Sequence, residues 1–146
     1  MENILIVDDQ LCIRELVSEE LNREGYLVKS VGDAESLRKY LTSSPPDLVL
    51  LDLYLDDSDG FGVLRNIKRQ HPHMPVLIFT AYDSYVDDSR LSQADGYVIK
   101  SCNFDELKQK IADVLRHRPA PNLKKGDGMR LCVCAGTTSN FGDVQL

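Results

Sequence analysis

The stretch from Asp47 to Gly60 reads DLVLLDLYLDDSDG and joins a continuous apolar run to a cluster of acidic residues. Four apolar residues in succession, Leu48 to Leu51, are typical of a strand that is buried on both faces. Asp52 follows at once, so we expect a carboxylate at the end of this buried strand. The acidic residues beyond it also fit a solvated turn, so this stretch alone leaves a functional site and a plain loop equally open.

Shorter apolar runs on both sides of this stretch predict four more strands, at Asn3–Val7, Tyr26–Val31, Val76–Phe79 and Tyr97–Ile99. Apolar residues at helical spacing predict helices around 13–21, 34–41, 60–67 and 105–118, and a weaker, polar helix at 83–93. Gly25 is a natural helix stop and Asp33 a natural helix N-cap. Strands that alternate with helices indicate a parallel sheet with helices on both faces.

The first predicted helix has an apolar face that should pack on the sheet, made of Ile13, Leu16, Val17 and Leu21. Cys12 and Cys102 are expected to pack as small hydrophobic residues. None of the four cysteines has a zinc-binding spacing, so we interpret them as reduced thiols. A redox role for the close pair Cys132 and Cys134 remains an alternative.

Four of the five predicted strands end next to polar or charged side chains. Asp8 and Asp9 follow the first strand, and the others are Asp52 after the third, Thr80 after the fourth and Lys100 after the fifth. In an open parallel sheet, ligands bind outside the carboxyl ends of the strands, near the point where the strand order reverses. These side chains are therefore expected at one binding edge.

Three carboxylates at one edge repel each other and cost stability unless a cation compensates them. Mg²⁺ suits such a site, because it takes one or two carboxylates, keeps several waters and completes its shell with phosphate oxygen. Lys100 and Thr80 add donors for an anionic ligand. The set therefore predicts a phosphoryl group beside a metal ion.

No phosphate-binding glycine loop accompanies this set, because neither GxxxxGK[ST] nor GxGxxG occurs in the sequence. A nucleotide-binding protein is therefore disfavoured. The remaining chemistry is a carboxylate that is itself the nucleophile and forms an aspartyl phosphate. Asp52 is the best candidate, as the single acid that directly ends the central strand, whereas Asp8 and Asp9 are better placed as metal ligands.

Five short motifs give the chain a family resemblance: VDD at Val7 to Asp9, LLDL around Asp52, Asp59-Gly60, Thr80-Ala81 and YVIK ending at Lys100. Together they resemble the receiver domain of two-component response regulators. The resemblance implies a flavodoxin-like, doubly wound α/β fold, with a five-stranded parallel sheet of order 2-1-3-4-5 and helices on both faces. Residues 1–118 would form the receiver (phosphoacceptor) domain, and residues 119–146 a linker or tail that is disordered, a truncation remnant or an expression scar.

By that resemblance, a sensor histidine kinase or a phosphotransfer protein would donate a phosphoryl group to Asp52 in a Mg²⁺-dependent reaction. Asp9, Asp52 and the backbone carbonyl of Tyr54 would bind Mg²⁺ directly, and Asp8 would hold it through water. Phosphorylation would then switch the binding of an output partner, which the sequence does not name, or the formation of a homodimer.

Lys100 and Thr80 would contact the phosphoryl oxygens. The movement of Thr80 toward the phosphate would leave room for Tyr97 to rotate inward and would bias a two-state surface. Taken singly, these residues also fit plainer roles, because Thr80 could cap a strand and Tyr97 could be an ordinary core aromatic.

The sequence departs from the family pattern at several positions. Ser101 follows Lys100 where the family usually has a proline with a cis peptide bond that positions the lysine. A non-proline cis bond costs about 2.5–4 kcal/mol, so either the fold enforces it or Lys100 sits differently. Tyr54 and Tyr82 are bulky and are expected to slow the attack of water on the acyl phosphate. The segment between Thr80 and Lys100 predicts a shortened or irregular fourth helix and an unusual signalling surface.

The formal charge is −6, from 17 basic and 23 acidic residues in a chain of 146. An acidic surface has no long-range attraction for nucleic-acid backbones or anionic membranes, so direct binding of this chain to either is disfavoured. The N-terminal sequence MENILIVDD lacks the basic segment of a signal peptide and the long apolar segment of an anchor, which predicts a cytoplasmic protein.

Two other functions compete with the phosphoacceptor. Aspartyl-phosphate phosphatases use a similar fold and a nucleophile at a strand end, but they need a second aspartate two residues later, and Tyr54 stands there. This favours a receiver that only assists its own phosphorylation and dephosphorylation over an enzyme. A degenerate receiver that binds partners without phosphorylation is the third hypothesis, and it is disfavoured by the presence of Asp8, Asp9, Asp52, Thr80 and Lys100.

Overall fold

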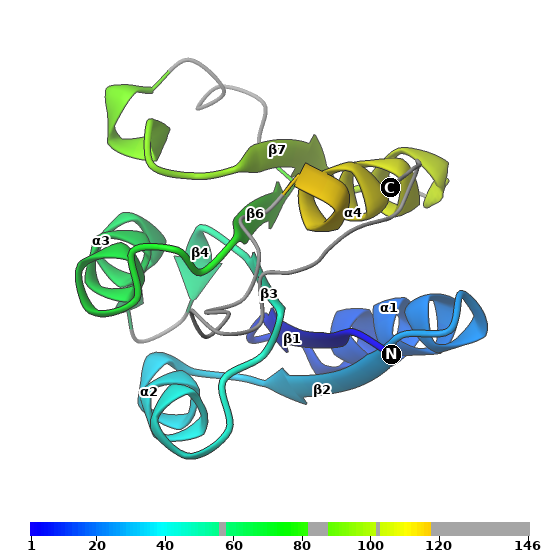
Figure 1. The fold of residues 1–146 in the computed structure, drawn as a ribbon, viewed down its shortest axis with the longest axis horizontal. Coiled ribbons are helices and arrows are strands. Elements are labelled where there is room, and N and C mark those ends of the chain that lie inside the picture. The colour runs from blue at the N-terminus through cyan, green and yellow to red at the C-terminus, as the bar shows by residue number, and fades with distance from the viewer. Residues whose placement is uncertain (56–57, 82–87, 102, 118–146) are drawn as a thin grey trace, which may run out of the picture.

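The computed structural model describes residues 1–55, 58–81, 88–101 and 103–117. Its sheet has five parallel strands in the order β2-β1-β3-β6-β7 (Figure 1), with β1 Asn3–Val7, β2 Leu27–Val31, β3 Leu48–Leu51, β6 Val76–Thr80 and β7 Gly96–Ile99. Counted along the chain, this is the order 2-1-3-4-5, so the predicted fold is confirmed. The expectations for Tyr82, for Cys102 and for the tail at 119–146, which contains Cys132 and Cys134, lie outside the described residues.

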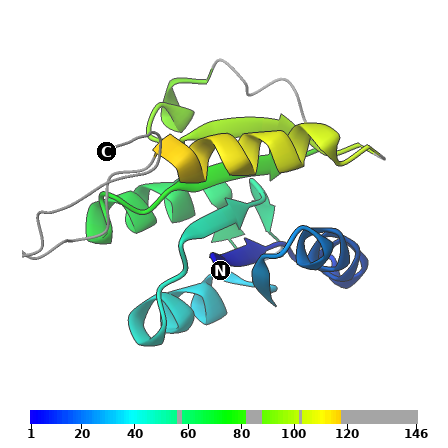
Figure 2. The same ribbon diagram turned by 45° about the vertical axis from the view of Figure 1, so that its right-hand side comes forward.

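Helices cover both faces of the sheet. On one face lie α1 Leu11–Arg23 and α4 Asp105–His117, and on the other lie α2 Ala34–Ser43 and α3 Gly60–Gln70 (Figure 1). In the turned view of Figure 2, α4 lies across the front of the sheet and α1 is seen almost end-on. Within the described residues, no helix combines the length and the apolar character needed to cross a membrane.

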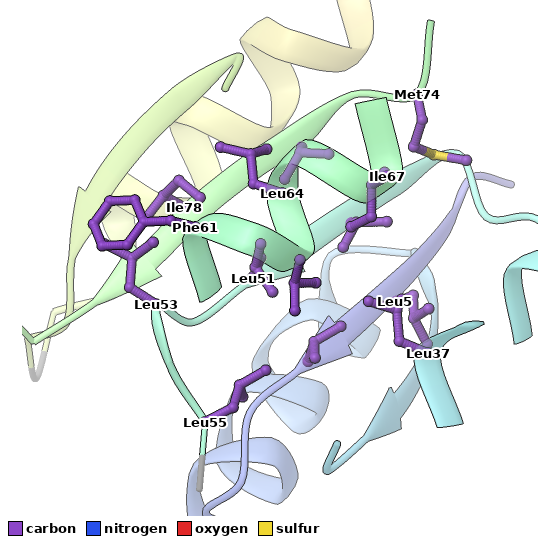
Figure 3. Packing of buried hydrophobic residues seen from close by; sticks show 14 of the residues in the cluster. Leu5, Leu37, Leu51, Leu53, Leu55, Phe61, Leu64, Ile67, Met74 and Ile78 are labelled. Atoms are coloured by element: carbon purple, nitrogen blue, oxygen red, sulfur yellow. The ribbon is translucent and has the colours of Figure 1, made fainter. Parts of the chain in front are cut away.

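The central strands are buried because alternate side chains enter two separate cores. Leu5 of β1 packs with α2 and α3, whereas Ile4 packs with α1 and α4. In the apolar run at 48–51, each side chain is at most 1% exposed. Figure 3 shows the first core, where Leu37 of α2 and Leu64 of α3 pack over the sheet. The interpretation of 48–51 as a strand buried on both faces is therefore confirmed.

Local signals in the sequence place the ends of several helices as expected. Gly25 follows α1 with a φ of +98°, a left-handed conformation that glycine adopts without strain. Asp33 caps α2, because its carboxylate accepts a hydrogen bond of 2.7 Å from the backbone N–H of Ser36. Asp59 caps α3 and accepts from the N–H of Phe61 at 3.2 Å.

Two expectations for α1 are wrong. Leu16 is 47% exposed, and Cys12 is exposed as well. The helix turns Val17 and Leu21 into the core, and residues one position earlier are rotated by about 100° around the helix axis. Leu16 therefore turns away from the core, and Cys12, four residues before Leu16, lies on the same exposed side of α1.

A short antiparallel ladder follows Asp52 and has no counterpart in the sequence-based prediction. β4 Tyr54–Leu55 pairs with β5 Ser58–Asp59. The backbone N–H of Gly60 then donates to the carbonyl of Leu53 at 3.1 Å. These contacts place Tyr54–Leu55 against Ser58–Asp59 and tie the start of α3 to Leu53.

The predicted helix at 83–93 is not formed in the described part of that segment, which begins at residue 88. It holds instead the single 3₁₀ turn η1 Ser89–Leu91. Leu91 is 7% exposed and joins the core of α2 and α3, and the guanidinium of Arg90 lies 3.8 Å from the ring centroid of Phe61. In the described part, Leu91 and the contact of Arg90 with Phe61 anchor a single turn to the core.

Candidate functional site at the carboxyl edge of the sheet

Three carboxylates meet where β1 and β3 end. These strands are neighbours, with Val7 paired to Leu51, so the residues that follow them leave the sheet side by side. Asp8, Asp9 and Asp52 each offer a carboxylate oxygen within 4.8 Å of the others. Asp8 is 1% and Asp52 6% exposed, whereas Asp9 is half-buried. The structure therefore brings the predicted acidic residues together at the rim of the core.

Lys100, which follows β7, bridges two of these carboxylates. Its Nζ donates to an oxygen of Asp8 at 2.6 Å and to an oxygen of Asp52 at 2.9 Å. Its backbone N–H donates to the carbonyl of Thr80 at 2.7 Å, which ties the end of β7 to the end of β6. No peptide bond between described residues is cis. Lys100 still reaches both carboxylates, although Ser101 stands where the family usually has a proline.

Burial and charge act against each other at this site. Burial raises the pKa of the Asp52 carboxyl, the nearby Asp8 raises it further, and the hydrogen bond from Lys100 offsets part of the effect. Burial lowers the pKa of Lys100, but its hydrogen bonds and attraction to Asp8 and Asp52 outweigh burial, and the pKa is raised. Lys100 is therefore a permanent cation at neutral pH, held between two acids.

We expect Asp52→Asn to raise the thermal stability of the protein near neutral pH by a few degrees. Because the folded protein raises the pKa of Asp52, ionisation of this carboxyl costs stability as the pH rises through the folded pKa. Asparagine carries no charge at any pH, so its advantage should appear in that window and persist above it. The measurement is Tm between pH 3.5 and 8 for both proteins.

Asp105→Asn is the control for this comparison, since Asp105 is exposed in the first turn of α4. Its Tm at pH 7 should be close to that of the parent, because an exposed side chain is solvated in both variants. An Asp52→Asn protein that is no more stable than the parent at pH 7 would contradict the cost assigned to the buried carboxylate.

Thr80 is the last residue of β6 and is completely buried. Its Oγ1 has no hydrogen-bond partner among the described residues. A buried hydroxyl without a partner costs free energy, which a ligand oxygen at this edge would relieve. Thr80 and Lys100 are joined by a backbone hydrogen bond, so the hydroxyl and the ammonium lie on adjacent strands. Together they are suited to bind the oxygens of one anion.

The two tyrosines predicted for the site occupy different surroundings. Tyr54 is 45% exposed in β4, and its N–H donates to Asp52 at 3.2 Å. Tyr97 lies in β7 opposite Ile78 and packs, half-buried, against the core of α2 and α3. The structure thus places Tyr54 beside the carboxylates and Tyr97 at the edge of the core. The switch role of Tyr97 stays a prediction.

Two further residues contact the acidic pair and are absent from the sequence-based site. The backbone N–H of Gln10 donates to Asp8 at 2.9 Å, and Arg14 Nη1 donates to the carbonyl oxygen of Asp8 at 2.7 Å. In the sequence, Arg14 looks like part of the solvated face of α1. Arg14 lies one turn into a helix that begins directly after Asp8 and Asp9. This position is the sequence signal that could have identified Arg14 as part of the site.

The donor set fits a hard divalent cation. It consists of carboxylate oxygens from separate strands, two of the three residues being almost fully buried. Lys100 supplies one positive charge against three negative ones, so the site keeps an excess of negative charge. Oxygen ligands, excess negative charge and the Thr80 hydroxyl, unpartnered within the described chain, suit Mg²⁺ with a phosphoryl group.

This fold and site define a class of signalling and phosphotransfer domains, in which acids and a lysine from separate parallel strands meet at the carboxyl edge. A model of the response regulator receiver domain matches residues 4–112 of the chain. The protein belongs to the response regulator receiver domain family.

Named relatives agree with this assignment. The chain is 31% identical over 125 residues to the probable transcriptional regulatory protein TcrX of Mycobacterium tuberculosis, covering 84% of this chain and 53% of TcrX. It is 32% identical over 119 residues to the DNA-binding transcriptional regulator NtrC of a Bradyrhizobium strain, covering 82% of this chain and 25% of NtrC. The match thus spans only part of the length of either relative.

Solved structures give the same result for the fold. The response regulator TrrA of Thermotoga maritima, in complex with Mg²⁺-BeF, has a TM-score of 0.76 and 39% identity, covering 78% of this chain and 99% of TrrA. TrrA in complex with the histidine kinase ThkA gives a TM-score of 0.75 and 40% identity, covering 79% of this chain and 99% of TrrA.

Proposed function

We propose that Asp52 accepts a phosphoryl group from a phosphorylated histidine kinase or phosphotransfer protein in a Mg²⁺-dependent reaction, and that this switches partner binding. The observation that carries the proposal is the setting of its carboxylate. Asp52 is 6% exposed, lies within 4.8 Å of Asp8 and Asp9, and is 2.9 Å from Lys100 Nζ. A nucleophile held between acids and a fixed cation is suited to phosphoryl transfer.

In the proposed step, a carboxylate oxygen of Asp52 attacks the phosphorus atom of a donor phosphohistidine. A P–O bond to Asp52 forms while the P–N bond breaks, and the donor imidazole keeps the electron pair. The Lys100 ammonium lies 2.9 Å from Asp52, so it can stabilise the negative charge on the phosphoryl oxygens during the transfer. The buried Thr80 hydroxyl can then donate to a phosphoryl oxygen and gain the hydrogen bond that it lacks among the described residues.

We assign the direct binding of Mg²⁺ to Asp9, Asp52 and the backbone carbonyl of Tyr54, and its water-mediated binding to Asp8. The contacts of Asp8 support the indirect role, because its carboxylate already accepts hydrogen bonds from the N–H of Gln10 at 2.9 Å and from Lys100 at 2.6 Å. Mg²⁺, when bound, neutralises charge on the carboxylates and the phosphoryl oxygens. The complex of the similar TrrA with Mg²⁺-BeF supports this assignment.

The proposed switch couples Thr80 to Tyr97. Thr80 ends β6, and Tyr97 pairs with Ile78, two residues before it. A shift of Thr80 toward the phosphoryl group would free space beside the strand and let the half-buried Tyr97 turn further inward. The surface around η1, β7 and α4 would then change for an output partner or a second copy of the chain.

We further propose that residues 1–118 form the receiver and that 119–146 is a linker or tail. The longer relatives are named transcriptional regulators, which supports an output domain or output partner that acts on DNA while this domain does not. The cytoplasm is the proposed location.

The test is the intact mass of the protein after incubation with Mg²⁺ and acetyl phosphate. We expect one added phosphoryl group on the parent protein and none on Asp52→Asn. The control is Asp105→Asn, which removes an exposed carboxylate and should leave the added mass unchanged.

Other results would favour the competing functions. An equal adduct on Asp52→Asn would refute Asp52 as the acceptor. No adduct from acetyl phosphate or from a phosphorylated histidine kinase would support a degenerate receiver. Release of many phosphates per protein molecule from a phosphorylated substrate would support a phosphatase, which the exposed tyrosine two residues after Asp52 disfavours.

The exposed apolar side of α1 predicts where the kinase docks. Leu11 is 57% and Leu16 47% exposed, and they lie on the helix that begins directly after Asp9. Exposed leucines beside a reactive site are suited to a partner surface. We expect Leu16→Ser to slow phosphotransfer by about tenfold, the effect of losing about 1.4 kcal/mol of binding. The measurement uses a phosphorylated histidine kinase that transfers to the parent protein.

Leu27→Ser is the matched control, because Leu27 in the edge strand β2 is 48% exposed. It should leave transfer from the kinase unchanged. Acetyl phosphate should modify both variants at the rate of the parent, since no docking surface is needed. Equal transfer rates for Leu16→Ser and Leu27→Ser would exclude Leu16 from the docking surface.

A further inference from the structure

Arg14 reaches back from α1 to the loop that carries the acidic pair. Its Nη1 donates to the carbonyl oxygen of Asp8 at 2.7 Å, so it binds the peptide group that joins Asp8 to Asp9. We infer that Arg14 is a positioning residue, which fixes this peptide so that the carboxylate of Asp9 faces the metal. The inference rests on the proposed function and adds a residue that touches neither metal nor phosphate.

The neighbours of Asp8 leave this peptide little freedom. The backbone N–H of Asp8 donates to the carbonyl of Val31 at 3.1 Å, and its carboxylate accepts from the N–H of Gln10 and from Lys100. The carbonyl oxygen is the remaining polar group, and Arg14 binds it. Since Asp9 is the next residue, the orientation of the Asp8 carbonyl sets the direction in which the backbone of Asp9 leaves β1.

Gly32 provides the space for the guanidinium. A Cβ atom at this position would lie 2.7 Å from Arg14 Nη1 and 3.4 Å from its Cζ. The atoms in the way belong to the end of a flexible side chain, so alanine at 32 should displace the guanidinium rather than the backbone. The glycine after β2 thus lets Arg14 reach Asp8, which links β2, α1 and the acidic pair.

Charge and position predict opposite effects when Arg14 is removed. Arg14 carries a permanent positive charge and binds the backbone of the acidic pair, so its charge alone opposes the binding of Mg²⁺ there. Loss of the charge would tighten the binding of Mg²⁺. Loss of the hydrogen bond to the Asp8 carbonyl would weaken it, because partners behind the ligands of a metal orient those ligands. The sign of the change therefore distinguishes the two roles.

The experiment measures the dissociation constant of Mg²⁺ by calorimetric titration, with no phosphoryl donor present. We expect Arg14→Gln to weaken the binding of Mg²⁺ by about tenfold, the lower end of the effect for outer partners of metal ligands. Gly32→Ala should also weaken it, although this variant keeps every charge. Tm without Mg²⁺ is recorded for each variant, because a merely structural role would lower Tm and leave the affinity of the folded protein unchanged.

Arg23→Gln is the control variant. Arg23 lies at the far end of α1, where it pairs with Glu19 at 3.2 Å and Glu20 at 3.0 Å on the exposed surface. It removes the same charge from the same helix and should leave the affinity for Mg²⁺ unchanged.

Unchanged or tighter binding in Arg14→Gln, or unchanged binding in Gly32→Ala, overturns the positioning role. These outcomes leave the proposed function intact as long as the parent protein binds Mg²⁺ and accepts a phosphoryl group. A parent protein that binds no Mg²⁺ would refute the proposed function itself, and the role of Arg14 with it. The two failures are therefore distinguished by the parent protein alone.

Discussion

Replacement of Lys100 by methionine is expected to slow the phosphorylation of Asp52 by about a hundredfold, the effect of losing one positioned donor to a developing charge. Lys100 Nζ lies 2.9 Å from Asp52 and 2.6 Å from Asp8, and the lysine side chain is 14% exposed. The measurement is the initial rate of mass addition with acetyl phosphate at saturating Mg²⁺.

The same substitution should tighten the binding of Mg²⁺ by about tenfold, since loss of a competing cation worth about 1.4 kcal/mol changes the affinity by that factor. Lys100 and Mg²⁺ are attracted to the same two acids, Asp8 and Asp52. Without metal, Lys100→Met should unfold more easily, because it leaves buried carboxylates without their partner. One variant thus separates metal binding from phosphoryl transfer, which change in opposite directions.

Lys108→Met is the matched control. Lys108 also bridges two acids, Glu20 at 3.0 Å and Glu24 at 3.4 Å, but these lie near the end of α1 that is far from Asp9. It should change neither the affinity for Mg²⁺ nor the phosphorylation rate. Weaker binding of Mg²⁺ in Lys100→Met would contradict the competition, and an unchanged rate would remove Lys100 from the transfer step.

Gly60→Ala is expected to destabilise the protein by about 3 kcal/mol, at the upper end of the cost of added bulk in a packed site. Helix propensity alone predicts the opposite, because alanine is favoured over glycine in a helix by about 1 kcal/mol. A Cβ atom on Gly60 would lie 2.5 Å from both the Cα and the carbonyl oxygen of Leu53. Backbone atoms cannot turn aside as a side chain can, so the ladder after Asp52 must shift.

Gly62→Ala, two residues along the same helix, is the control. Its Cβ would meet nothing closer than 3.9 Å, so it should stabilise the protein by about 0.5–1 kcal/mol. The measurement is the free energy of unfolding in urea for both variants. Similar changes in the two variants would mean that the contact of Gly60 with Leu53 does not limit this position.

The sequence predicted the parts of this protein that depend on burial and chain direction. Continuous apolar runs predicted the central strands, because a strand that is buried on both faces has apolar side chains at every position. The acids after Val7 and Leu51 could be placed together without coordinates, since the carboxyl ends of parallel strands share one edge. These inferences use only the direction of the chain and the period of its side chains.

The features that the sequence did not predict depend on how α1 is rotated about its axis and on hydrogen bonds to backbone groups. The orientation of α1 decides that Leu16 is exposed while Val17 is buried, and apolar spacing alone did not separate the two. The ladder at Tyr54–Leu55 is held by backbone pairing in an acidic loop, where side-chain type carries little information. The hydrogen bond from Arg14 to the Asp8 carbonyl could not be predicted from the sequence either, because every residue has a backbone carbonyl.

The contact between Lys100 and Asp8 joins residues that are 92 positions apart, one after the first strand and the other after the last. A pairing of such long range forms only when the intervening chain has been ordered, so in folding terms it belongs to the completion of the domain. A fragment that lacks β7 lacks Lys100, the cation that bridges Asp8 and Asp52. Any ion or phosphoryl group that binds this edge therefore stabilises the whole domain against unfolding. The free energy of unfolding should differ between the free and the phosphorylated domain.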